Sequence, residues 1–520
     1  MNIIYNKFFD DYIKIFPTFN DYLSLSKYSN LKKYYENSIS DDHIELQKKF
    51  LNSYKNKVKE TNITSKIFNY NIKISLEELK YNFHLLPLNQ SNNPISDFVE
   101  MASGHGLYKF KNENDYIFFV EKTYHFSIFL NQCISNMKKG ISKNIVLSKH
   151  ICKLLIDQIK SILKNKAYIK KEVPKKIHNY NKTIANILEP VLNDLLNFLS
   201  NEYLINCRNS LGLSGLPNGE KMYNFLVRYY TTLKKVDILD IHNYGISEVK
   251  RIYKEMHQIK NKLGFKGNIK DFNNKIHSDP KLKFKNATEL IQEHLRIQKK
   301  IYNTVFKDKF DIKISHNYDI KKVPDFNKKF APEAYYIPCD IEKKRKGTFY
   351  INTNNLKNLN KIEIESLALH EGIPGHHLQL TYLIDNNFPM FLKTMSLTAY
   401  EEGWALYCEQ LGEYEELLSY YGKLDLEMMR AIRLVVDTGI HQYNWSYQKC
   451  VNYFKKYSFL NESIIKAELD RYIAIPGQAL SYKIGERVFK ELKIKTKKSE
   501  KDFHNMIIKK GPLPLFLLSP

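Results

Sequence analysis

The segment Ala368–Leu380 reads ALHEGIPGHHLQL and holds three closely spaced histidines, His370, His376 and His377. The residues before it, IEIESLAL at 362–369, have the apolar spacing of a helix. On an undistorted helix His376 would point roughly 240° away from His370, because each residue turns by about 100°. His377 would return to the same face but would lie about 10 Å along the axis. A regular helix therefore cannot bring two of these imidazoles to one metal ion.

Pro374 and Gly375 interrupt this helical pattern. Proline breaks the backbone hydrogen-bond ladder, and glycine accepts dihedral angles that other residues avoid. We therefore expect a kinked or locally unwound segment that returns one of the two later histidines to the first. The pair His370-Glu371 also looks like the opening of H-E-x-x-H, a helix in which the glutamate is the general base of a zinc protease.

A mononuclear zinc site needs a third protein ligand, and the best candidate lies in Thr398–Gly412, TAYEEGWALYCEQLG. Glu402 precedes a Gly-Trp pair on a helix-like pattern, and Glu401 and Glu409 are nearby. The alternative for such acids is a solvated helix face. The alternative for the His-Glu pair is a hydrogen-bonded helix without metal. The combination of both segments favours the metal site.

Most of the 520-residue chain has helical patterning. Helices are predicted at 43–60, 141–165, 184–206 and 245–264, the last one beginning at Ser247 and ending at Gly264. The polar, Lys/Asn-rich stretch 265–285 is predicted to form loops. The best strand signal is GTFYINT at 347–353, which is rich in β-forming residues. The sequence therefore predicts a mainly α fold with a small sheet.

The helical pattern is interrupted near residues 325–345 by Pro332, Pro338 and the run EKKRKG. This interruption separates an N-terminal, mostly helical part, residues 1–330, from a C-terminal part, residues 331–520, that carries the candidate metal site. The two parts can equally form one continuous helical domain.

The charge balance is strongly basic, with 80 Lys and Arg against 56 Asp and Glu, a formal net charge of +24. The basic residues are mostly Lys, whereas base readout and bidentate phosphate contacts favour Arg, so we expect no specific nucleic-acid partner. No apolar run approaches the roughly 20 residues that span a bilayer. The six cysteines contain no C-x-x-C pair, and no secretory signal is evident. These features predict a cytoplasmic protein without a membrane partner.

The H-E-x-x-P-G-H-H element at His370–His377 resembles the signature of the DUF885 family, zincin-like proteins in the gluzincin metallopeptidase clan. Further blocks are similar to that family in the same order: Ile238–Met256, GTFYINT, EGWALYCEQLG, RAIRLVVDTGIH and RYIAIPGQALSYKIGE. The resemblance runs from roughly residue 80 to the C-terminus. It implies a large helical zincin-like fold with a small β-sheet next to the active-site helix.

The resemblance also implies one Zn²⁺ per chain. The ligands carried over are His370, Glu402 and one of the two later histidines, with Glu371 as the base. We favour His376 because ordinary helical zincins often carry glycine before the second ligand. His377 is then an alternative ligand or a neighbour of the ligands. The Glu-Gly-Trp-Ala block also resembles the Asn-Glu-Gly-Phe-Ala block of aminopeptidase-type gluzincins, from which this chain departs at Glu401.

An oxyanion formed during hydrolysis needs a hydrogen-bond donor, and two residues are candidates. The first is Tyr482, in PGQALSYKIG, and the second is His441, in VVDTGIH. Asp437 lies one helical turn before His441 and could orient its ring. The alternatives are an ordinary tyrosine and a hydrogen-bonded helix histidine.

Arg433 and Arg471 could bind a substrate carboxylate bidentately, as in a carboxypeptidase or dipeptidase. The alternative is an internal ion pair with Asp437, Glu427 or Asp470. The strand at 347–353 is a candidate sheet edge that could add an extended peptide as a further strand.

The sequence thus predicts a zinc-dependent hydrolase, a metallopeptidase that cleaves short peptides. One alternative is an amidase for a modified or non-peptide substrate, because fold does not determine substrate. Another is a non-catalytic, basic helical binding protein. The expected partner is a peptide or small amide substrate.

Overall fold

The computed structural model describes residues 2–105, 108–323, 334–342, 345–354, 356 and 359–518. The chain divides into two compact units. The first unit comprises Met1–Phe225, His441–Ser446 and Ile473–Ile475. The second comprises Leu226–Ile440, Tyr447–Tyr472 and Pro476–Pro520. The boundary predicted between residues 330 and 331 lies outside the described residues.

The first unit consists of helices. The division at Phe225 falls within the last of them, α10. These helices are α1 (Asn2–Ile15), α2 (Phe19–Leu23), α3 (Asp41–Tyr54), α4 (Ile63–Glu78), α5 (Pro94–Ala102), α6 (Glu113–Ser142), α7 (Lys149–Asn165), α8 (Tyr180–Phe198), α9 (Leu204–Asn206) and α10 (Gly219–Thr231).

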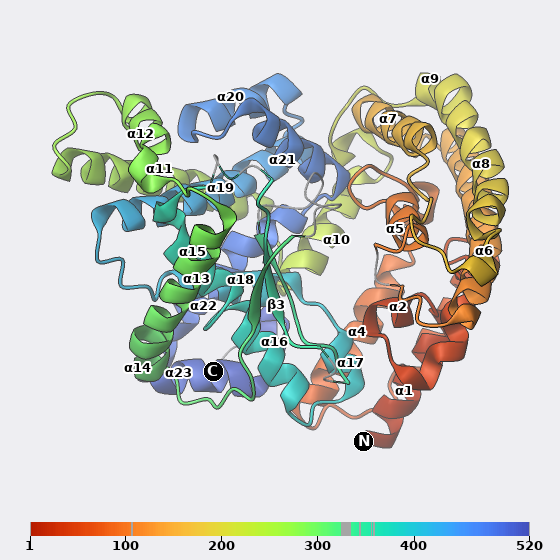
Figure 1. Ribbon diagram of the computed structural model, residues 1–520, viewed down its shortest axis with the longest axis horizontal. Coiled ribbons are helices and arrows are strands. Elements are labelled where there is room, and N and C mark those ends of the chain that lie inside the picture. The colour runs from red at the N-terminus through yellow and green to blue at the C-terminus, as the bar shows by residue number, and fades with distance from the viewer. Residues whose placement is uncertain are drawn as a thin grey trace. The chain divides into compact units, whose positions relative to one another are not determined.

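The long helix α6 organises the first unit and packs along α8 (Figure 1). It begins with a capping box in which Asn112 and Asp115 bond each other's backbone N–H groups. Lys122 of α6 is fully buried and forms an ion pair with Asp21 at 2.8 Å. Since a buried charge is stable only when it is paired, this contact ties α6 to the N-terminal helices.

The second unit combines helices with a small sheet. Its helices are α11 (Ile238–Lys262), α12 (Ile269–Ser278), α13 (Ala287–Ile301), α14 (Lys307–Lys309), α15 (Ile364–Glu371), α16 (His376–Asp385), α17 (Met390–Thr394), α18 (Thr398–Glu409), α19 (Leu417–His441), α20 (Tyr447–Tyr457), α21 (Glu462–Ala474), α22 (Ser481–Thr496) and α23 (Glu500–Lys510).

The sheet has three strands in the order β1-β3-β2, with β1 at Asp319–Lys322, β2 at Ala334–Ile337 and β3 at Thr348–Ile351. β3 is parallel to β1 and antiparallel to β2. The strand predicted at 347–353 is therefore present as β3. The prediction that it forms a sheet edge is wrong, because β3 pairs on both sides, and its buried residues Phe349 and Ile351 suit that central position.

The predicted helices correspond to α3, α7, α8 and α11, but several bounds differ. Residues 143–148, predicted as helical, lie between α6 and α7, and α3 ends at Tyr54. α11 begins at Ile238 with Asp237 as its N-cap, not at Ser247. The loop prediction for 265–285 is wrong, because α12 lies within it. Asn268 caps α12, and three apolar side chains on one face of that helix are buried despite its polar composition, Ile269, Phe272 and Ile276.

Among the described residues, no helix is both long and apolar enough to cross a bilayer.

Candidate metal centre

The helix that carries His370 ends at Glu371, and a new helix begins at His376. The intervening residues, 372–375, are buried. Trp404 donates its indole N–H to the carbonyl oxygen of Pro374 at 2.9 Å and so ties this break to α18. Gly375 lies so close to α15 that a Cβ there would overlap the carbonyl oxygen of His370. The interruption expected from proline and glycine is therefore a true break between two helices.

This break brings the His376 ring to His370, with ring centroids 4.8 Å apart. The Nε2 atoms of His370 and His376 lie 3.4 Å and 3.6 Å from the same carboxylate oxygen of Glu402. One ligand atom from each of these three residues lies within 4.8 Å of the others. Two imidazoles and one carboxylate are a donor set that suits zinc and leaves a coordination position open for water or substrate.

His377 points to a different neighbourhood. Its Nδ1 accepts the Tyr336 hydroxyl at 2.7 Å, and its Nε2 donates to the carbonyl oxygen of His316 at 3.1 Å. Burial lowers the pKa of His377 to about 4. Because both ring nitrogens are engaged, the geometry favours His376 as the ligand.

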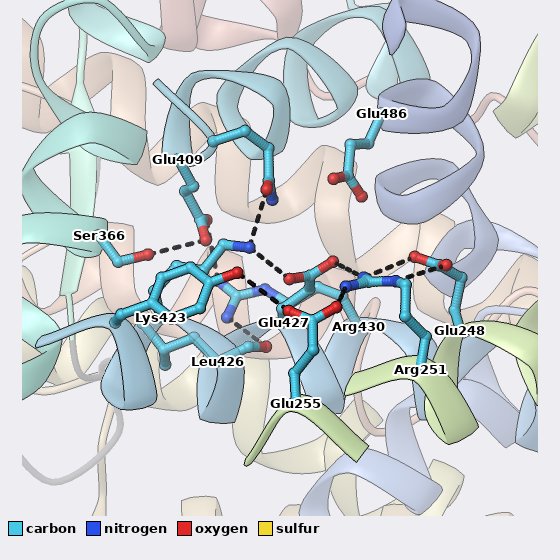
Figure 2. A network of polar contacts seen from close by, with 12 residues as sticks. Glu248, Arg251, Glu255, Ser366, Glu409, Lys423, Leu426, Glu427, Arg430 and Glu486 are labelled. Carbon is cyan, nitrogen blue, oxygen red and sulfur yellow. Dashed lines mark hydrogen bonds and ion pairs between the residues drawn. The ribbon is translucent and has the colours of Figure 1, made fainter. Parts of the chain in front are cut away.

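Glu409 is a site residue for which the sequence analysis had no role. Its carboxylate, on α18, accepts the Nδ1–H of His370 at 2.7 Å. It also accepts the Ser366 hydroxyl at 2.8 Å, the bond drawn in Figure 2. Since a carboxylate can only accept, the first contact assigns the Nδ1 proton of His370 and leaves Nε2 facing Glu402. The seven-residue spacing from Glu402 to Glu409 puts both on one helix face and is the signal that could have revealed it.

The electrostatics of the cluster follow from burial and pairing. Burial alone would lower the pKa of His370, but its contacts with Glu402 and Glu409 outweigh this effect and raise the pKa to about 10. Burial alone would raise the pKa of both carboxylates. Arg430 and His370 instead hold the pKa of Glu409 below its usual value, and the two histidines hold that of Glu402 well below it. The acids are thus ionised, and the cluster is suited to a cation.

Glu371 is the last residue of α15 and is 8% exposed. Its negative charge raises the pKa of His370, and it adds to the effect of burial in raising that of Tyr318. No described residue forms a hydrogen bond or ion pair with its carboxylate. An ionisable oxygen pair beside the histidines is therefore available to a water molecule.

Helices α18 and α22 approach closely because Gly403 and Gly485 face each other (Figure 1). A Cβ on Gly403 would overlap the backbone of Gly485. Glu402 is next to the first glycine, and Tyr482 lies one helical turn before the second. Burial and the charge of Glu402 raise the pKa of Tyr482.

Residues 17–519 match the family described as "Bacterial protein of unknown function (DUF885)". The chain belongs to the DUF885 family.

Two solved structures, each described as that of a "putative lipoprotein", share the fold of this DUF885 chain. The Colwellia psychrerythraea protein has a TM-score of 0.86 and 22% sequence identity, covering 99% of this chain and 97% of that one. The Shewanella oneidensis protein, described as of unknown function, has a TM-score of 0.76 and 16% identity, covering 99% and 98%. No curated protein matches. These descriptions give no support to the cytoplasmic location expected from the sequence.

The two arginines predicted to bind substrate lie together in the second unit of this DUF885 chain. The Nη2 atoms of Arg433 and Arg471 lie 3.1 Å and 3.0 Å from one carboxylate oxygen of Glu468. Glu468 is none of the acids considered as partners from the sequence. The Arg433 guanidinium also stacks on Tyr482, 4.4 Å from its ring centroid.

His441 belongs to the first unit and is fully buried. Its Nδ1 accepts the backbone N–H of Leu213 at 3.1 Å, and its ring lies 5.1 Å from that of Tyr223. Asp437 accepts the backbone N–H of Gly477 with both oxygens. The surroundings of His441 are those of a hydrogen-bonded core histidine, and a catalytic role for it stays a prediction.

A second group of three possible ligands lies in the second unit, His277, Glu363 and Asp425. Its histidine and aspartate are 3.6 Å apart, and all three residues are partly exposed. This group provides a natural control for the buried cluster.

Proposed function

We propose that this DUF885 chain is a zinc-dependent hydrolase with a zincin-like, gluzincin-type fold that cleaves amide bonds in short peptides. The observation that carries the proposal is the convergence of His370, His376 and Glu402 beside Glu371, whose carboxylate forms no hydrogen bond or ion pair with a described residue. A bound Zn²⁺ would act there as a Lewis acid and lower the pKa of water.

The chain's own residues supply the remaining chemistry. Glu371 accepts a proton from the attacking water and passes it to the leaving amine. Glu409 holds His370 in one tautomer and orientation. Tyr482 lies one helical turn before Gly485, which meets the helix of Glu402 at Gly403, and its hydroxyl is placed to donate to the oxyanion that develops on the scissile carbonyl.

The first test is zinc content by elemental analysis after incubation with zinc and removal of unbound metal. We expect about one zinc per chain in the wild type and a large loss in Glu402→Ala, because three protein ligands are needed. Glu363→Ala, in the second histidine–acid group, should keep the wild-type content. Wild-type protein without zinc would contradict the proposed function.

The second test separates metal binding from proton transfer. Glu371→Gln should retain zinc and lose peptide cleavage by a factor of about 10² to 10⁴, the usual contribution of a general base. Cleavage of a mixed peptide library is measured by mass spectrometry. Zinc-loaded wild type that cleaves no peptide would favour the amidase alternative or a binding protein.

A further inference from the structure

Two groups of paired charges, each with buried members, lie in the second unit, and they differ in the number of cations and acids. In the first, Lys423, Lys483, Lys490 and Arg251 face four acids, Glu248, Glu255, Glu427 and Glu486 (Figure 2 draws most of them). Glu427 lies at the centre and contacts three of the four cations. Each cation has a carboxylate, so this network needs no external ion and is explained as structural.

The second group, Arg433, Arg471 and Glu468, has two cations and one acid. Arg433 binds Glu468 through Nε at 3.2 Å and Nη2 at 3.1 Å, and Arg471 binds the same oxygen. Gln478, a neutral group, accepts the other contact of Arg471 at 2.7 Å. Among the described residues no second acid forms an ion pair with either arginine. Within the described part of the chain, this group therefore has one more positive charge than negative charges.

The lack of a second acid has an energetic cost because Arg433 is buried. The Arg433 side chain is 7% exposed, and its buried Nη1 has no hydrogen-bond partner among the described residues. The Arg471 side chain is 25% exposed and is the accessible member. Burying a donor or a charge without a partner costs free energy unless a ligand supplies the acceptor or the opposite charge.

The arginines and the metal cluster share one neighbour, Tyr482. The Arg433 guanidinium lies over its ring, 4.4 Å from the ring centroid. Tyr482 lies one helical turn before Gly485, which meets Gly403, the residue next to Glu402. A substrate whose scissile amide lies at the cluster can therefore extend past Tyr482 toward Arg471.

We propose that Arg471, with Arg433 behind it, binds the terminal carboxylate of the substrate, so that the enzyme is an exopeptidase for peptides with a free C-terminus. The inference rests on the proposed function. Water adds across the last amide, the C–N bond breaks, the shortened peptide leaves as a carboxylate, and the released amino acid takes the proton on its amine. The planar fork of arginine matches the two carboxylate oxygens.

The test measures binding without turnover, in the zinc-loaded Glu371→Gln background. Two mixtures of N-acetylated tripeptides, one of free acids and one of C-terminal amides, are incubated together with the protein. Bound peptides are separated by gel filtration and quantified by mass spectrometry. We expect acids to be retained at least about tenfold over amides, since loss of one charged contact costs roughly that factor.

Substitutions test whether Arg471 causes the preference for free acids over C-terminal amides. Arg471→Met should remove the preference, and Arg471→Lys should restore part of it. Arg487→Met, at a surface arginine that pairs with Asp240 and Glu491, should not alter it. Equal retention of acids and amides, retention of neither, or a preference that survives in folded Arg471→Met would overturn the inference.

Cleavage by wild type separates this inference from the proposed function. If zinc-loaded protein cleaves the C-terminal amides as fast as the free acids, the proposed hydrolase function is supported and the carboxylate-binding site is ruled out. If the free acids bind through Arg471 but no peptide is cleaved, the carboxylate-binding site is supported and the hydrolase function is ruled out.

Discussion

At the scale of single residues, the cluster depends on contacts that the local sequence only partly reveals. The sequence predicted His370, Glu371 and Glu402, because a His-Glu pair and a Glu-Gly-Trp block are recognisable strings. It favoured His376 but kept His377 as an alternative, since which histidine returns depends on the path of four buried residues. The structure favours His376 because His377 is held by other partners.

The prediction at this scale concerns Glu409. Replacing it by glutamine removes the negative charge behind His370 and should weaken zinc binding by about 10- to 100-fold, as for other groups that orient a ligand histidine. Competition with a chelator of known affinity measures the change. Glu413→Gln, at an exposed acid just beyond α18, is the control and should bind zinc as the wild type does. Unchanged affinity in Glu409→Gln would show that the contact is not needed.

At the scale of elements, the site is assembled by two packed helices and one helix break. The contact of α18 with α22 relies on a glycine from each, and this contact sets Glu402 near Tyr482. The break after α15 is tied to α18 by Trp404. Helix patterns alone do not tell which helices will pack, because many pairs of apolar faces are compatible.

Gly403→Ala tests this assembly. The added methyl group meets the backbone of α22, which cannot move aside as a flexible side chain would, so the helices must separate. We expect a loss of about 1–3 kcal/mol in the free energy of unfolding and a lower zinc content. Urea unfolding and elemental analysis measure the two effects. Lys495→Ala, on the exposed side of α22, should change neither. A fully stable, zinc-replete Gly403→Ala would argue against the close contact.

At the scale of the whole molecule, stability also depends on buried groups outside the candidate metal cluster. His294 of α13 is 1% exposed, and neither ring nitrogen has a hydrogen-bond partner among the described residues. Burial lowers its pKa to about 3, which the charge of Glu293 only partly opposes. The folded state therefore holds this histidine neutral, whereas the unfolded chain protonates it near pH 6.5.

The sign of the pH dependence follows from these two values. Between about pH 6.5 and 3 the unfolded state binds the extra proton, so the free energy of unfolding falls as pH falls. The contribution is at most about 1.4 kcal/mol per pH unit for one group. His294→Leu should flatten the curve measured by urea unfolding at pH 7.5, 6 and 5. His178→Leu, at an exposed histidine, should not. An unchanged slope in His294→Leu would contradict the burial of a neutral ring.

By itself the sequence determined a mainly helical fold, the strand β3, the break at Pro374-Gly375 and the residue types of a candidate metal centre. These features are local, because periodicity, helix breakers and ligand spacing act within a few residues. Only the tertiary structure decided the central place of β3, the partnership of Glu409 with His370, and the sharing of Glu468 by two arginines. Each of these joins segments distant in the chain, and such contacts depend on which surfaces pack together, which no short pattern encodes.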